Sequence, residues 1–303
     1  MRLIVIQNIE YREVQNFVLG KNDHVNLNEL PYWPFRTVFP ICTQKKGLIP
    51  IGTFYLPFNT ISDFEFKIIE KNISNLSSEE IIFIPHIRKN DEETLQKLRE
   101  LGFYLIDVEG ESIVKYIGID SDEYLREKIG SKRFREHNRI VRKSQEYIVM
   151  TYTLEEVLHD FTLFEGWSNL FNIHEQKYNN SISVYGSDFL NKFSILKNYG
   201  EYQFNFRFSG DQIIQVYLTR ITSDTLYLIA AASHPHYIEN GINLYTTLMM
   251  DNIKEKNRLN IEFLHLGRGG KERKLMYGAN VYIPHIHAIY TKSQDVSHEI
   301  DNG

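Results

Sequence analysis

The chain has 303 residues, of which 42% are hydrophobic and 24% charged, with a formal net charge of -5 and one cysteine, Cys42. These values are typical of a soluble globular protein with one large domain or two small ones, and the acidic balance argues against a dedicated nucleic-acid binder. A single cysteine excludes an internal disulfide framework, and we interpret Cys42 as a buried hydrophobe rather than a nucleophile. No apolar run reaches the about 18 residues that span a membrane, and the first residues lack the apolar core of a signal peptide. We therefore expect a cytoplasmic protein.

Residues 1–60 alternate short apolar runs with turn signals. Residues 30–40 hold three prolines and predict a loop or an edge segment. A helix is predicted after Ser62, with Phe64, Ile68 and Ile69 on one face. The pattern then predicts a buried strand, a short helix, and two strands or a hairpin (79–87, 90–103 and 104–119). This alternation favours an α/β block over an all-β one.

The next segment, 120–147, is predicted to be helical and is highly charged. Between residues 126 and 143 it holds eight Lys or Arg and two Glu. One interpretation is a solvated helix that joins two halves of the chain. The other is a cationic face that meets a phosphate-bearing partner, which the clustering of positive charge in an acidic chain favours.

A second α/β block follows. Its pattern predicts a strand, a long helix or helix pair, a helix, a three-stranded antiparallel meander, a helix and two strands (147–153, 154–178, 187–200, 202–235, 237–259, 260–266 and 279–290). The expected domains are an N-terminal half, a charged helical connector, a C-terminal domain and a polar tail (1–119, 120–147, 148–292 and 293–303).

Two motifs in this block indicate chemistry. In the first, a strand ends at Ser233 and a helix starts after Asn240 and Gly241. A helix N-terminus suits an anion, although a plain connection explains the pattern equally well. The second is the cationic loop "HLGRGGKERKLMYGA", residues 265–279. It fits neither the Walker A spacing nor the dinucleotide-binding glycine pattern.

The order of elements and this second motif resemble the GNAT acyltransferase superfamily, and within it the Fem-type, tandem-GNAT branch. The family's Gly-Arg-Gly and late Gly-Ala are matched by residues 267–269 and 278–279. The resemblance implies an α/β (α+β) fold of tandem GNAT-like domains, each a mixed, largely antiparallel sheet flanked by helices. Three positions depart from ordinary GNATs. Ile238 replaces an Arg or Gln, Asn243 replaces the last small residue of the pyrophosphate loop, and Lys274 replaces a tyrosine.

The resemblance also implies roles for individual residues. Lys274 and Arg268 would bind phosphate or steady negative charge, and His265 would act as a base. Tyr277, at the family's aromatic position, is a candidate catalytic residue, and Tyr217 would line the acceptor groove. The expected donor cradle, the backbone turn that would bind the acyl donor, consists of Asn240, Gly241 and Asn243. Two histidine pairs, His234/His236 and His285/His287, could each supply two metal ligands. No pattern in the sequence supplies a third ligand to either pair, so we expect no bound metal.

The implied reaction is N-acyl transfer by direct attack in a ternary complex. The expected donor is an acyl-CoA or an acyl carrier protein, and the acceptor is an amine of a small molecule or peptide. The basic segment 126–143 fits a carrier protein, the net charge makes tRNA less favoured, and no membrane is expected. The alternatives are an aminoacyl-tRNA-dependent peptidyl transferase of Fem type, or a catalytically degenerate binding or scaffold protein.

Overall fold

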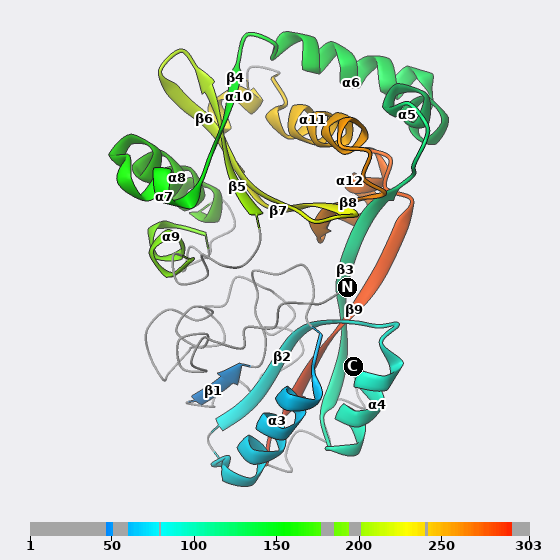
Figure 1. The fold of residues 1–303 in the computed structure, drawn as a ribbon, viewed down its shortest axis with the longest axis vertical. Helices are drawn as coiled ribbons and strands as arrows, with labels where there is room; N and C mark the ends of the chain where they lie inside the picture. The colour runs from blue at the N-terminus through cyan, green and yellow to red at the C-terminus, as the bar shows by residue number, and fades with distance from the viewer. Residues whose placement is uncertain are drawn as a thin grey trace. The chain divides into compact units, whose positions relative to one another are not determined.

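The computed structural model describes residues 47–50, 60–78, 80–176, 185–193, 201–239 and 242–292. The expected proline-rich loop at 30–40, Cys42, the pair Asn240 and Gly241, and the tail 293–303 lie outside the described residues. The described residues form two compact units (Figure 1). The first holds those up to Gly110 and from Ile283 onward, and the second holds those between 111 and 282. The division into domains that the sequence suggests stays a prediction.

The first unit is a sheet with two helices. Its strand order is β1-β2-β9-β3, with β2 antiparallel to β9 and parallel to β1. Its elements are β1 (Gly47–Pro50), α3 (Asp63–Asn75), β2 (Glu80–Arg88), α4 (Glu92–Glu100), β3 (Tyr104–Lys115) and β9 (Val281–Tyr290), the ends of the last two reaching into the second unit. Ser62 begins α3 as predicted, through a capping box with Glu65.

Two expectations for this unit are wrong. Phe64 is 66% exposed, and Phe66 and Ile69 form the buried face of α3 instead. The predicted pair of strands or hairpin at 104–119 is one strand, β3, of 12 residues. Its glycine, Gly110, makes no turn: a Cβ there would overlap the carbonyl of Ile283, so the residue allows β9 to approach closely.

The second unit is a larger sheet covered by helices. Its strand order is β3-β8-β7-β6-β5-β4, in which only β7 and β8 are parallel. The remaining strands are β4 (Ile148–Tyr152), β5 (Glu201–Ser209), β6 (Gln212–Ile221), β7 (Thr225–Ser233) and β8 (Phe263–Arg268). The predicted meander is therefore confirmed, because β5, β6 and β7 pair antiparallel in sequence.

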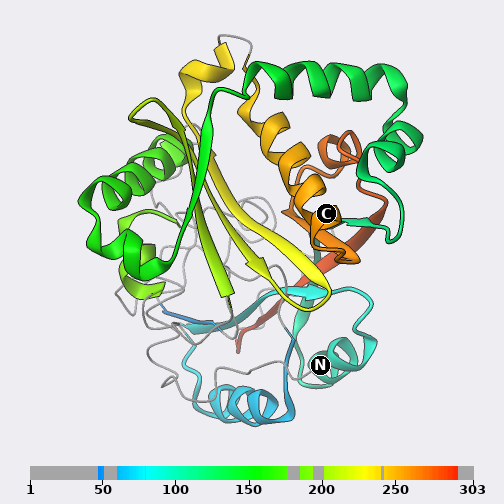
Figure 2. The ribbon, with the colours of Figure 1, turned by 45° about the horizontal axis from the view of Figure 1, so that its top comes forward.

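Helices cover both faces of this sheet. They are α5 (Ser121–Ile129), α6 (Ser131–Lys143), α7 (Leu154–His159), α8 (Phe161–Gln176), α9 (Ser187–Phe193), α10 (Pro235–Glu239), α11 (Leu244–Arg258) and α12 (Lys271–Leu275). Helices α5, α6 and α11 lie on one face, and α7, α8 and α9 lie on the other (Figures 1 and 2). The predicted fold class, a mixed and largely antiparallel sheet flanked by helices, is confirmed.

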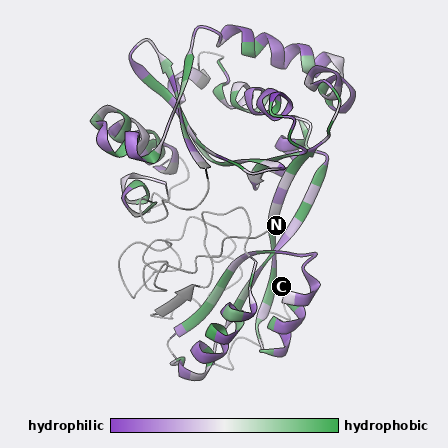
Figure 3. Ribbon diagram, viewed as in Figure 1, coloured by the Kyte–Doolittle hydropathy of each residue, from purple (hydrophilic) through white to green (hydrophobic). Residues whose placement is uncertain are grey.

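The charged connector is a helix pair that belongs to the second unit. Gly130, with a φ of 80°, separates α5 from α6. Phe134 and His137 bury one face of α6, and its outward side is largely hydrophilic (Figure 3). Under α11 the core is apolar and includes Tyr217, Leu248 and Met249.

Candidate active site

The pairing of the two parallel strands stops early. β7 and β8 pair at three positions only, of which the last joins Tyr227 to His265. Both strands continue, β7 to Ser233 and β8 to Arg268. A bulge in β7 between Leu228 and Ala230 falls at the same level. Beyond Tyr227, the backbone N–H and C=O groups on the side of β7 that faces away from β6 therefore have no ladder hydrogen bonds to β8. This open end of the two strands is the candidate site.

The glycine-rich loop closes the end of β8. Gly267, Gly269 and Gly270 have φ angles of 78°, 73° and 59°, which side chains with a Cβ rarely adopt. The ammonium group of Lys274 donates to the carbonyls of Gly267 and Arg268, both at 2.7 Å. Lys274 is 5% exposed. The glycines thus serve the turn itself, and the lysine holds the turn from inside.

His265 is held at both ring nitrogens. Its Nδ1 accepts the Gly267 N–H at 3.0 Å, and its Nε2 contacts the Glu111 carboxylate. Because Nδ1 is an acceptor, these contacts assign the ring proton to Nε2, directed at Glu111. Both side chains are almost fully buried. The pair fixes the first amide of the loop, and a role for His265 as a base stays a prediction.

Sequence reasoning missed Glu111. It lies 154 positions before His265, in a strand whose partner could not be identified from local pattern. Polar and apolar residues alternate along β3, and in such a pattern an acidic residue is normally expected to face solvent. The antiparallel pairing of β3 with β8 brings the two residues together.

The start of α11 is tied to the segment after the loop. Asn243 caps the helix by accepting the Thr246 N–H at 3.1 Å, and Thr246 Oγ1 lies 2.9 Å from the Tyr277 hydroxyl. The Arg273 guanidinium lies over the ring of Tyr245 at 4.4 Å. Two predicted site residues, Asn243 and Tyr277, are thus joined through Thr246. Both have structural partners, and their binding roles stay predictions.

His137 is a further buried residue that the sequence did not indicate. Its ring stacks on Tyr277 with the centroids 5.0 Å apart. Burial, followed by the nearby Arg133, lowers the pKa of His137, so the ring is neutral near pH 7. Its Nδ1 is buried without a hydrogen-bond partner in the described part of the chain. His137 follows the apolar Phe134 by three residues, a spacing that places both on one face of a helix and could have indicated its burial. The many charged residues around it made this pattern hard to recognise.

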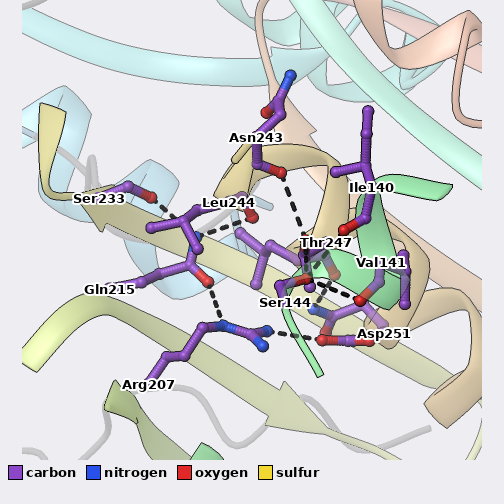
Figure 4. A network of polar contacts seen from close by, with 12 residues as sticks. Ile140, Val141, Ser144, Arg207, Gln215, Ser233, Asn243, Leu244, Thr247 and Asp251 are labelled. Carbon is purple, nitrogen blue, oxygen red and sulfur yellow. Dashed lines mark hydrogen bonds and ion pairs between the residues drawn. The ribbon is translucent and has the colours of Figure 1, made fainter. Parts of the chain in front are cut away.

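A buried polar network anchors the first turn of α11 to the sheet (Figure 4). Arg207 donates to Gln215 Oε1 at 3.0 Å and to Asp251 Oδ2 at 2.6 Å. Gln215 Nε2 donates to Ser233 Oγ at 2.8 Å and to the carbonyl of Leu244 at 3.1 Å. The network therefore connects β5, β6 and β7 to the helix that begins beside the open strand end.

Two predicted residues lie differently from the others. Tyr217 is 7% exposed inside the core under α11, and burial raises the pKa of its hydroxyl. Arg268, partly buried at the end of β8, faces Glu111 in the register of the sheet. Of the donor cradle, Asn240 and Gly241 lie outside the described residues.

Neither a metal centre nor a membrane span is found in the part of the chain that the structure describes. No group of three or more His, Cys, Asp or Glu there is arranged to hold a metal ion. No described helix is long and apolar enough to cross a membrane.

Comparison with solved structures identifies the fold. L-PGS from Bacillus licheniformis is 11% identical, with a TM-score of 0.52 over 78% of this chain and 75% of that one. The C-terminal domain of a protein assigned as a lysylphosphatidylglycerol synthetase, from Agrobacterium fabrum, is 11% identical, with a TM-score of 0.51 over 79% and 76%. The chain therefore shares its fold with these two proteins.

FemX is also similar, at 12% identity and a TM-score of 0.47, over 84% of this chain and 83% of that one. No family model matches the sequence, and no curated protein matches it. The likeness is therefore one of fold.

Proposed function

We propose that the chain is an N-acyltransferase that moves an acyl group from a thioester donor, acyl-CoA or an acyl carrier protein, to an amine of a small molecule or peptide. The observation that supports this is the open end of β7 and β8 beside the start of α11, in a GNAT-like fold. Acyl transfer needs little more than a bound donor, an aligned amine and a donor group for the oxyanion.

The reaction would use the backbone of β7. The amine nitrogen attacks the thioester carbonyl, a C–N bond forms, and the C–S bond breaks as the thiolate leaves. N–H groups of β7 beyond Tyr227, which have no ladder partner on β8, would stabilise the oxyanion. The proton lost by the amine passes to the thiolate directly or through water.

Donor phosphates would be attracted to the start of α11. Two of its first amides are already engaged, since Leu244 N–H donates to Ile242 O at 3.1 Å and Thr246 N–H donates to Asn243. Attraction would therefore come from the helix dipole and from the exposed cations Lys271 and Arg273. Lys274 and His265 act in this proposal as positioning residues, because both hold the 267–270 loop rather than face solvent.

The experiment is native mass spectrometry and thermal shift with a panel of acyl-CoAs. We expect a bound CoA mass and a melting temperature that rises with ligand concentration. If no acyl-CoA binds, the CoA donor is wrong, and an acylated carrier protein is tested in the same way.

A variant separates an enzyme from a degenerate scaffold. Lys274→Met removes the donor to Gly267 and Arg268, so we expect at least about tenfold lower turnover. The matched control is Lys254→Met, an exposed lysine in the second half of α11, where turnover should change little. If the wild-type protein shows no turnover with any acyl-CoA or acylated carrier protein, the result would favour a catalytically degenerate scaffold protein.

A second candidate is transfer from an aminoacyl-tRNA, because the basic surface of α6 suits an RNA backbone. Lys132, Arg133, Arg135, Arg142 and Lys143 are exposed on α6, and no carboxylate of the described residues forms an ion pair with them. Such a row fits an RNA backbone as well as an acidic carrier protein. Binding of aminoacyl-tRNA in preference to acylated carrier protein would decide for this candidate.

A further inference from the structure

Strand β4 forms an open edge of the sheet in the second unit. It is the last strand in the order, and it pairs residue by residue with β5 on one side only. No other described strand pairs with it. Open edges are normally protected by charge, proline or a bulge, and the sequence IVMTY has no charged residue or proline.

The side chains of β4 are exposed on both faces. Ile148 is 66% exposed, Val149 36% and Met150 47%. Neighbours along a strand point to opposite faces, so Ile148 and Met150 leave one face apolar and Val149 the other. An uncharged apolar edge of this kind is a template for another strand.

We propose that β4 pairs antiparallel with β4 of a second copy of this chain, forming a twofold dimer. With the twofold axis at Met150, Ile148 lies beside Tyr152 of the second copy, and the two Met150 side chains meet. Val149 lies beside Thr151 of the second copy. Four of the five positions then face a β-branched or aromatic residue, which favour strands, and Met150 faces its own copy, so the edge is complementary to itself.

The flanking charges favour the same partner. Two basic residues and one acidic residue precede β4 (Arg142, Lys143 and Glu146), so this side is basic on balance. Two acidic residues, Glu155 and Glu156, follow β4, and all five are exposed. In any antiparallel self-pairing, the segment before one strand meets the segment after the other. Basic residues of each copy therefore approach acidic residues of the other, which a parallel arrangement would not achieve.

Sedimentation velocity over a wide range of protein concentration tests the dimer. Wild type should pass from monomer to dimer as concentration rises. Met150→Lys, which sets two ammonium groups against each other at the axis, should raise the dimer dissociation constant at least about tenfold. The matched control is Phe64→Lys, which changes an apolar residue on α3 that is even more exposed than Met150 and should leave the constant unchanged.

A charge swap tests the orientation. Lys143→Glu and Glu155→Lys should each weaken the dimer, and the double variant should restore it. A wild type that stays monomeric at every concentration overturns the proposal and leaves the edge to an extended peptide of another protein. A dimer unaffected by Met150→Lys, with circular dichroism showing an intact fold, assigns the contact to another surface.

Discussion

Lys256 places an ammonium group inside the second unit. The residue is 1% exposed on α11, and its Nζ donates to the carbonyl of Tyr116 at 2.5 Å. The same atom lies 3.6 Å from the centroid of the Tyr116 ring. Burial lowers the pKa of Lys256 from 10.5 to about 8, partly opposed by Glu262. The folded protein therefore binds this proton less tightly than the unfolded chain does.

This difference predicts a stability that rises with pH. Between about pH 8 and 10.5 the unfolded chain keeps a proton that folded Lys256 has lost, so the free energy of unfolding increases with pH. The slope from this group is at most about 1.4 kcal/mol per pH unit. Urea denaturation at about pH 8 to 9, which ends about one unit below the ordinary tyrosine pKa of about 10, should show the increase in wild type and not in Lys256→Met. If the free energy of unfolding depends on pH in the same way for wild type and Lys256→Met, the prediction is contradicted.

At the scale of elements, the position of α11 depends on the network around Arg207. The Arg207 side chain is 3% exposed, and its guanidinium pairs with Asp251 on the helix and Gln215 on β6. Arg207→Met would leave both partners without their donor, so we expect a loss of about 2–4 kcal/mol in the free energy of unfolding. Chemical denaturation measures this directly.

The same helix offers the control. Arg258 and Glu255 form a surface pair in which the arginine side chain is 69% exposed, and exposed pairs contribute little. Arg258→Met should therefore change the free energy of unfolding much less than Arg207→Met does. Equal losses in the two variants would mean that the buried network does not hold α11.

How far the sequence predicts an element depends on where its contacts come from. The caps at Ser62 and the meander turns are local, so α3 and the strands β5 to β7 were expected. The face of α3 was misjudged because Phe64 and Phe66 both fit an apolar pattern, and only packing distinguishes them. The single strand β3 was missed because the close approach of Ile283 to Gly110 joins distant parts of the chain.

The candidate site was predictable to a smaller extent than the elements. The loop motif located Gly267, Arg268 and Lys274 correctly as one structural feature. It did not reveal that the lysine points into its own loop, nor that Glu111 lies against His265. Direction of a side chain and long-range pairing depend on tertiary structure, which no local spacing encodes.

At the scale of the whole molecule, an acidic chain carries a local basic face. Lys132, Arg135, Arg139 and Lys143 lie at spacings of three and four residues on α6, opposite the buried Phe134 and His137. Arg139 is engaged by Glu136, with contacts of 3.1 and 2.6 Å. The face therefore attracts anions locally although the net charge of -5 repels them at a distance.

The double variant Lys132→Glu with Arg135→Glu tests whether this face binds the donor's carrier. Binding of an acylated carrier protein should weaken at least about tenfold, and the dependence of affinity on salt should become shallower, because two interfacial cations are lost. Lys67→Glu with Lys71→Glu on α3 changes the net charge equally at two other exposed lysines and should have little effect. If both variants weaken binding alike, the effect follows net charge, and α6 is only a solvated helix. If only the first does, the cations of α6 form the contact.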